Sequence, residues 1–149
     1  MYQVVPLLLA FAMLVPWSGP ADPGNRMTAA NAADGLAEQA LIYHQAAIAY
    51  VLANPGASGV VTGMMLPAGW SALGLSACAI GRIVATTVTV PSTVSKPAVA
   101  AAMAKLWGGY PIAGQTAANA LINPITGASL PLPCAVSDHT PAIVSQAGG

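Results

Sequence analysis

The sequence predicts an α+β domain. An N-terminal hydrophobic segment and a long amphipathic helix come first, and a second, shorter helix accompanies a small, mostly antiparallel sheet. Apolar residues recur with a helical period from Ala29 to Asn54, and β-branched residues dominate Ile83–Val90. An Asn-Pro-Ile-Thr-Gly turn with short apolar runs on both sides indicates a hairpin within residues 119–132. The resulting order of helix, strands, helix and strands is typical of an α+β domain.

The composition excludes several classes of function. Only eight of the 149 residues are charged, four of each sign, and 56% are hydrophobic types. Soluble domains carry about 25% charged residues, so 5% is far below the usual content. The chain has no basic surface that could neutralise phosphates, which argues against a nucleic-acid partner. A neutral and nearly uncharged chain instead suits a protein that lies at a membrane or inside an assembly.

Residues 1–20 are expected to be an N-terminal hydrophobic anchor or an export signal. Val4–Trp17 contains fourteen residues without a charge, whereas a spanning helix needs about 20. The run reaches that length only when it is extended over residues 1–20, which include Pro6 and Pro16. A secretory signal peptide has an apolar core of about 7–15 residues and explains the segment equally well. The membrane is therefore an expected partner through this segment, and its cleavage is left open.

Residues 21–29 are rich in turn-forming types and predict a linker, after which residues 30–149 form a single α+β domain. The long helix at the start of this domain has an apolar face formed by Leu36, Ala40, Tyr43, Ala47 and Tyr50, at alternating spacings of four and three. Polar residues such as His44 are expected elsewhere on its surface, exposed or partly buried. Asn54-Pro55-Gly56 ends the helix, because the residue before a proline avoids the α conformation.

Short strands and one more helix follow. Gly59–Thr62 is expected to be a short strand, and a Gly-, Pro- and Ser-rich stretch continues to the strand predicted at Ile83–Val90. Pro97 is typical of the first turn of a helix, which would run to Trp107. The remaining expected strands are Tyr110–Ala113, Asn119–Ile122, Ala128–Leu132 and Ala142–Ser145. Pro131 would place its strand at the edge of the sheet.

The two cysteines have no zinc-binding spacing. Cys78 and Cys134 are 56 residues apart, and neither belongs to a Cys-x-x-Cys pair. If the body is exported, one disulfide between them is the natural arrangement. Two buried free thiols are the alternative, and the sequence leaves both open.

Residues capable of catalysis are few and scattered. Asp34 and Glu38 lie near the start of the long helix, where the helix dipole favours acidic residues, so capping explains both. Gly74–Cys78 resembles the G-x-S-x-G turn of hydrolases but ends in cysteine instead of glycine. Asp138-His139 would supply two members of a triad, yet neighbours on a strand point to opposite faces. The sequence contains no metal-binding or phosphate-binding motif, so we predict no cofactor, no metal and no enzyme activity.

Three segments carry a resemblance to a known family. AEQALIYHQAAIAYVLANPG at Ala37–Gly56 is followed by LPAGW at Leu66–Trp70 and by ALINPITG at Ala120–Gly127. This arrangement resembles the small PilM proteins of conjugative thin pili and related type IVb pili, over about residues 30–135. The actin-like protein of type IVa pili that shares the name is different, because this chain is too short and lacks nucleotide-binding loops.

The resemblance implies a non-enzymatic structural component of a pilus assembly apparatus, associated with the inner membrane and with its body on the periplasmic side. Other pilus-assembly proteins are the expected partners, and an oligomer is compatible with this role. Packing between helix and sheet is the first explanation for Tyr43 and Tyr50. Their seven-residue spacing also allows them, together with Leu36, to form an interaction helix for a partner. Two other functions remain: a minor pilin-like subunit of the fibre, or a small serine hydrolase that uses Ser76 and His139.

Overall fold

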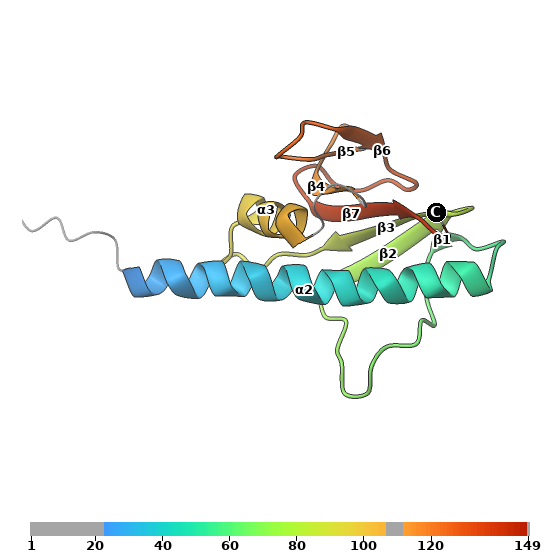
Figure 1. Cartoon of the computed structure of the whole chain (residues 1–149), viewed down its shortest axis with the longest axis horizontal. Helices are drawn as coiled ribbons and strands as arrows, with labels where there is room; N and C mark the ends of the chain where they lie inside the picture. Colours follow the sequence, from blue (N-terminus) through green and yellow to red (C-terminus); the bar gives the residue numbers. More distant parts are fainter. Residues whose placement is uncertain (1–22, 107–111, 149) are drawn as a thin grey trace, which may run out of the picture.

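The computed structural model describes residues 23–106 and 112–148, and it confirms the predicted α+β class. In chain order the elements are α2 (Pro23–Ala53), β1 (Ser58–Val60), β2 (Leu75–Ile80), β3 (Ile83–Val88), α3 (Lys96–Leu106), β4 (Ile112–Ala117), β5 (Ala120–Ile122), β6 (Ser129–Pro131) and β7 (Pro141–Gln146). The strands form one antiparallel sheet in the order β1-β2-β3-β7-β4-β5-β6 (Figure 1). The expected hydrophobic segment at residues 1–20 lies outside the described residues. Within the described ranges, no helix combines the length and the apolar content that crossing a membrane requires.

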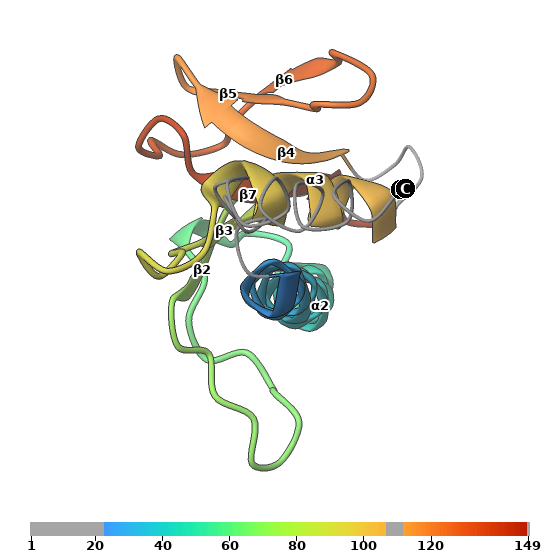
Figure 2. The ribbon, with the colours of Figure 1, turned by 90° about the vertical axis from the view of Figure 1, so that its left-hand side faces the viewer.

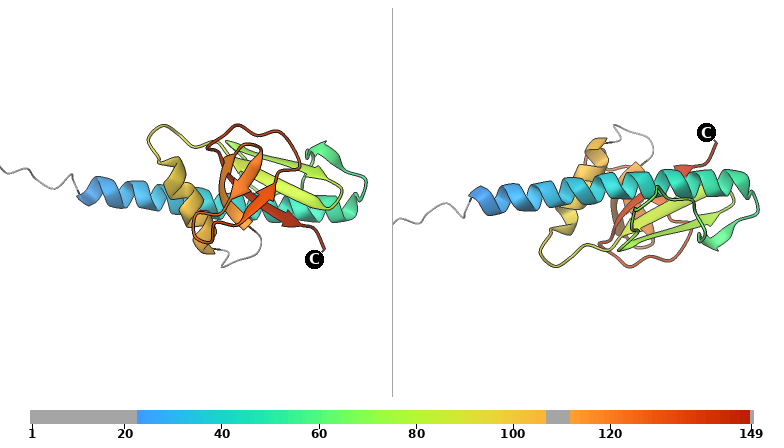
Figure 3. Two further views of the ribbon diagram at one scale, coloured as in Figure 1. Left: turned by 90° about the horizontal axis from the view of Figure 1, so that it is seen from above. Right: turned by 90° about the horizontal axis from the view of Figure 1, so that it is seen from below.

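α2 begins earlier than the sequence predicted. The linker expected at residues 21–29 is helical from Pro23 onward, and the first turns of α2 extend past the sheet (Figures 1 and 3). Proline is favoured at the start of a helix, because its ring presets φ and the N–H that it lacks would have no helical partner there. At the other end the helix stops as expected before Pro55, with the backbone N–H of Asn54 donating to the carbonyl oxygen of Tyr50 at 2.9 Å.

One stripe of α2 is buried against the sheet. Its members are mostly alanine and recur at spacings of four and three: Ala33, Ala37, Ala40, His44, Ala47 and Val51. Because an alanine side chain is a single methyl group, this stripe allows the helix to lie close to the strands. The face expected from the sequence is rotated by part of a turn, since Leu36 and Tyr50 are only half-buried.

The two helices cover the same face of the sheet. α2 packs on β2 and β3, α3 packs on β4 and β7, and the helices contact each other (Figure 2). Met103 of α3 and Ile143 of β7 are fully buried in the core between the layers. On the opposite face, Cys78 and Val144 belong to a second core that is covered by the segment 132–136.

β2 is a strand that its own sequence does not predict. Its residues, LSACAI, lie in a stretch that was expected to be irregular, because serine, alanine and cysteine show little preference for strands. β2 nevertheless pairs with β3 over its whole length, from Leu75 opposite Val88 to Ile80 opposite Ile83. The turn between them starts at Gly81, whose φ of 59° favours glycine. Pairing with the regular strand β3 therefore makes this segment a strand, although its own residue types have little preference for that conformation.

The other expected elements are present with shifted ends. The strand expected at Tyr110–Ala113 corresponds to β4, which continues to Ala117, and residues 110 and 111 lie outside the described residues. The strand predicted at Ile83–Val90 ends at Val88, and the second helix runs over Lys96–Leu106, with Trp107 outside the described residues. The hairpin forms as predicted, and Asn123 stabilises its turn because its side-chain oxygen accepts hydrogen bonds from two backbone N–H groups, at 2.8 and 2.9 Å. β6, which contains Pro131, is an edge strand as expected.

Candidate interaction groove

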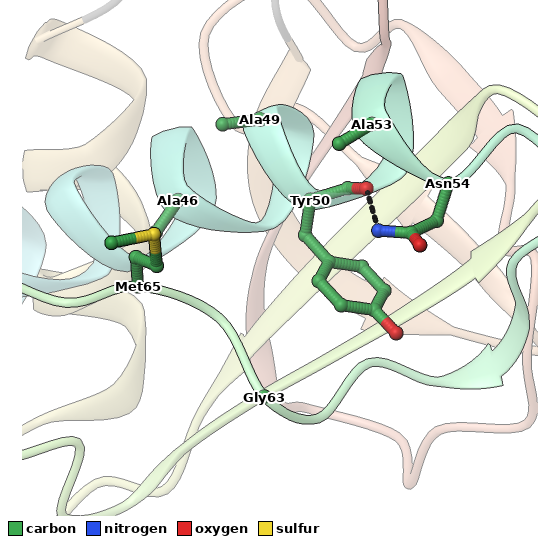
Figure 4. Close-up of a pocket in the computed structure, with 7 residues that line it drawn as sticks. All are labelled: Ala46, Ala49, Tyr50, Ala53, Asn54, Gly63 and Met65. Atoms are coloured by element: carbon green, nitrogen blue, oxygen red, sulfur yellow. Dashed lines mark hydrogen bonds between the residues drawn. The ribbon is translucent and has the colours of Figure 1, made fainter.

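An open groove lies between the last third of α2 and the segment that follows β1. Its volume is about 310 Å³, and it is lined by Ala46, Ala49, Tyr50, Ala53, Asn54, Gly63 and Met65 (Figure 4). All of these side chains are uncharged. The polar groups on the lining side chains are the Tyr50 hydroxyl and the Asn54 carboxamide, whose N–H donates to the backbone oxygen of Tyr50 at 2.9 Å. Such a lining suits contact with an apolar surface and offers little for acid–base or phosphate chemistry.

The first wall of the groove is a helix surface with very short side chains. Ala46, Ala49 and Ala53 are spaced three and four residues apart, which places them on one side of α2. Ala49 and Ala53 are exposed and Ala46 is half-buried. The helix therefore presents a low ridge of methyl groups at which another chain can approach the backbone closely.

The second wall belongs to the long connection between β1 and β2, residues 61–74, which runs past one side of α2 (Figures 1 and 2). Gly63 has a φ of 78°, and Met65 is 95% exposed with its side chain directed at Ala46 (Figure 4). A methionine side chain is flexible and adapts its shape to whatever packs against it. This wall therefore combines a glycine, which leaves the backbone uncovered by a side chain, with a flexible apolar side chain.

Aromatic stacking fixes the connection beside the helix. The rings of Tyr43 and Trp70 are stacked, with centroids 5.9 Å apart and an angle of 21° between their planes. At the start of the connection, Val61 is 4% exposed, and its N–H donates to the backbone oxygen of Ala77 at 2.9 Å. Leu66 also packs against the hydrophobic core that Tyr43 and Val61 share. The second wall is therefore held at both ends, although Met65 between them is exposed.

The three residues of the expected interaction helix lie in different surroundings. Tyr43 is only 7% exposed and packs inside the domain, where burial raises the pKa of its hydroxyl. Leu36 is half-buried against the core shared by α2, α3 and the sheet. Tyr50 lines the groove, and its ring extends from α2 toward the segment that carries Gly63 (Figure 4). The structure thus separates the two tyrosines: Tyr43 supports the groove from inside, and Tyr50 forms part of its lining.

His44 is buried, which corrects the expectation of a surface or partly buried histidine. Its side chain is 0% exposed in the middle of the α2 stripe. Nδ1 lies 2.8 Å from the hydroxyl oxygen of Thr86 on β3, and Nε2 lies 2.7 Å from that of Ser145 on β7. A neutral imidazole donates with one nitrogen and accepts with the other, and a hydroxyl can take either role. The sequence contains no local signal of this site, because Thr86 and Ser145 are 42 and 101 residues away from His44.

The burial of His44 also determines its charge. Transfer of an imidazolium ion into the core is unfavourable, so burial lowers the pKa of His44 from 6.5 to about 4. The ring is therefore neutral at pH 7, and the two hydroxyls supply the donor and the acceptor that a neutral imidazole needs. His44 lines neither the groove nor the pocket beside Ser76 and Thr140, and its two hydrogen bonds link the helix to the sheet.

Cys78 and Cys134 form a disulfide, which the sequence had left as one of two alternatives. Their Cα atoms are 6.5 Å apart, and the bond ties β2 to the segment that leads into β7. A shallow pocket of about 320 Å³ lies beside it, lined partly by the hydroxyls of Ser76 and Thr140. The bond lies on the sheet face opposite the helices and the groove.

The residues considered for hydrolysis do not form a triad. Ser76 lies within strand β2 and not at the strand-to-helix turn that a nucleophile elbow requires. Asp138 accepts a hydrogen bond from the backbone N–H of Ala118 at 2.9 Å, which gives it a structural role in a turn. In the described part of the chain, no hydrogen bond joins Ser76 to His139, and no three His, Cys, Asp or Glu residues are grouped to hold a metal ion.

Comparison with known proteins gives one match. A family model described as PilM matches residues 9–144, which is most of the chain, and confirms the resemblance carried by the three sequence segments. No curated protein and no solved structure matches the chain.

Proposed function

The chain belongs to the PilM family, which functions in thin pilus assembly, and from this premise we propose that it is a non-enzymatic structural component of the assembly apparatus. Its task in this proposal is to dock other assembly subunits. It does so through the groove on α2, with Tyr50 and Met65 as the main contact residues.

The observation that carries the proposal is that one segment with the family resemblance lines the groove and a second one supports it from inside. The helix segment Ala37–Gly56 supplies the alanine wall and Tyr50. The LPAGW segment at Leu66–Trp70 supplies the tryptophan that stacks on Tyr43 and holds the second wall in place. Both segments carry the resemblance to the family, and their contact lies directly beneath the groove.

The docking role can be tested with a charge placed in the groove. Met65→Asp should abolish or strongly reduce thin pili, counted by electron microscopy, because a partner would have to bury an unpaired carboxylate. Met65 is 95% exposed, so the folded protein itself should tolerate the change. Ile125→Asp is the matched control, since Ile125 is also exposed, at 63%, but lies in the β5–β6 turn. Normal pilus numbers with Met65→Asp would contradict docking through this groove.

We further propose that residues 1–20 tether the protein to the inner membrane and that the body lies in the periplasm. α2 starts immediately after this segment and leads to the groove at its far end, so a tethered body would present the groove away from the membrane (Figure 1). The disulfide fits an oxidising compartment. Protease added to intact spheroplasts should digest the body, and protection from the protease would contradict the periplasmic location.

A second candidate function is a minor, pilin-like subunit of the fibre itself. The observation that favours it is the projection of the first turns of α2 past the sheet, with Thr28–Asn31 exposed (Figure 3). A projecting helix can pack against the same helix of neighbouring subunits. Quantitative recovery of the protein in sheared pili would support this function and contradict the assembly role, whereas its retention with the cells would do the reverse.

A further inference from the structure

We propose that the occupant of the groove is an α-helix of another pilus-assembly subunit, and that the helix face in contact is apolar and uncharged. This inference rests on the proposed docking function and adds the kind of structure that docks. Three features of the walls support it: their hydrogen-bonding groups, their shape and their charge.

The walls cannot support an added β-strand. The backbone groups of Ala46, Ala49 and Tyr50 in the first wall are already used in the hydrogen bonds of α2, so they cannot pair with an extended chain. The second wall is no regular strand edge either, because β1 ends at Val60 and the positive φ of Gly63 turns the backbone soon afterwards. An extended peptide would bury backbone N–H and C=O groups without partners, which costs about 1–3 kcal/mol for each group. A helix satisfies these groups within itself.

The shape of the first wall suits a second helix. Interaxial distances between packed helices are about 8–10 Å and are shortest where the side chains in contact are small. Ala46, Ala49 and Ala53 carry no atom beyond Cβ, so they allow the close end of this range. Met65 then closes over the side of the incoming helix, because its flexible thioether chain adapts to an uneven surface.

The absence of charge restricts the face that can bind. No Asp, Glu, Lys or Arg occurs between Gln39 and Gly81, which includes every residue of the groove. The last charged residue on α2 before the groove, Glu38, is eight positions before Ala46, or about 12 Å along the helix axis. A charged residue on the partner that packs against this lining would therefore lose water without gaining an ion pair from it. One polar side chain could pair with the Tyr50 hydroxyl.

Site-specific crosslinking in cells that assemble pili tests the inference. A diazirine analogue of methionine is placed at position 65 of the full chain, with a second version at Ile125 as the control. After illumination, the residues that receive the crosslink are mapped by mass spectrometry. We expect crosslinks from position 65 to a pilus-assembly protein, at residues that recur every three or four positions on an uncharged face.

A substitution in the opposite wall provides a matched control. Ala49→Leu should lower the crosslinking yield from position 65 by at least about fivefold, because the added atoms separate the two helices. Ala30→Leu makes the same change at an exposed position near the other end of α2 and should leave the yield unchanged.

The contrary outcomes distinguish the inference from the proposed function. Crosslinks to a pilus-assembly protein at every second residue would indicate a strand and overturn the inference, while the docking function would stand. Crosslinks to a second copy of this chain would also overturn it. If position 65 reaches no pilus-assembly protein and Met65→Asp still assembles pili, the docking function itself fails.

Discussion

On the inner side of α2, Ala40 and Ala47 are 0% exposed and pack against the sheet, whereas Ala49 and Ala53 on the adjacent side are exposed and line a groove. The same residue type is thus buried against the sheet on one side of the helix and exposed in the groove on the other. In both cases alanine allows another layer to approach closely. On the inner side the sheet provides that layer. On the groove side, the described residues that line the groove besides those of α2 and Asn54 belong to the connection between β1 and β2.

The difference lies in what fixes the contact. The inner side has a polar link, because His44 bonds to hydroxyls on two different strands and the helix cannot slide or rotate without breaking both bonds. The groove side has no comparable link, and its most exposed residue is the adaptable Met65. The inner side therefore makes a permanent contact with the sheet of the same chain, whereas the groove is suited to a separate protein that binds to it. Substitutions on the two sides should separate stability from assembly.

The largest loss of stability is expected from His44→Ala. It leaves a cavity and two buried hydroxyls without their imidazole partner, and we expect the free energy of unfolding to fall by about 3–4 kcal/mol. Urea denaturation followed by circular dichroism measures this change. His139→Ala, at an exposed histidine, should alter it by less than about 0.5 kcal/mol. Equal effects of the two substitutions would show that the polar link does not hold the helix.

Acid should weaken the same contact without any substitution. The unfolded chain has a histidine pKa of about 6.5, and burial lowers the pKa of His44 to about 4 in the folded protein. Between these values the unfolded state binds more protons, so this contribution to stability is complete above pH 6.5 and declines as the pH falls toward 4. The loss is on the order of 3 kcal/mol below pH 4. Denaturation curves between pH 7 and 4 should show this slope, and His44→Ala should remove it.

A smaller effect is expected from Trp70→Ala, which acts on the groove side. The half-buried ring stacks on Tyr43, and its removal should lower the free energy of unfolding by about 1–2 kcal/mol. The connection that carries Met65 would lose its anchor, so pilus numbers should fall although most of the protein stays folded. Leu73→Ala is the control, because Leu73 lies in the same connection but is 83% exposed. Normal pilus numbers with Trp70→Ala would show that the second wall needs no fixed position.

The sequence predicted the elements whose pattern is local, and it missed those that depend on distant contacts. Both helices, β3 and the hairpin have a period or a turn motif that specifies them within a few residues. β2 has no such pattern and becomes a strand only because β3 pairs with it. Tyr50 was identified from its spacing. The second wall was not, because its position depends on a stack between Tyr43 and a residue 27 positions later, Trp70.

The burial of His44 was missed for the same reason. A polar residue in a helical pattern is assigned to the surface unless its partners are known, and Thr86 and Ser145 become neighbours only when β3 pairs with β7. The sequence does contain the spacing that includes His44, since residues 33, 37, 40, 44, 47 and 51 follow the four-three rhythm. This spacing predicts the buried face only when alanine, because of its small size, is counted as a buried residue on a par with leucine and tyrosine.

The smallest change in stability, and a complete change in function, is expected from Ala49→Leu. Ala49 is exposed, so the free energy of unfolding should change by less than about 0.5 kcal/mol. The same substitution at Ala40, which is 0% exposed, should cost about 2–3 kcal/mol because the larger side chain forces helix and sheet apart. Denaturation of both variants measures this contrast.

Pilus counts in cells that carry each variant then complete the comparison. Ala49→Leu should abolish pili at a normal protein level, because the added side chain occupies the space of the incoming helix. Ala40→Leu should reduce pili only as far as it reduces the amount of folded protein. If Ala49→Leu cells assemble pili normally, the alanine ridge on the groove side is simply helix surface, and the contrast between the two sides of α2 holds for stability alone.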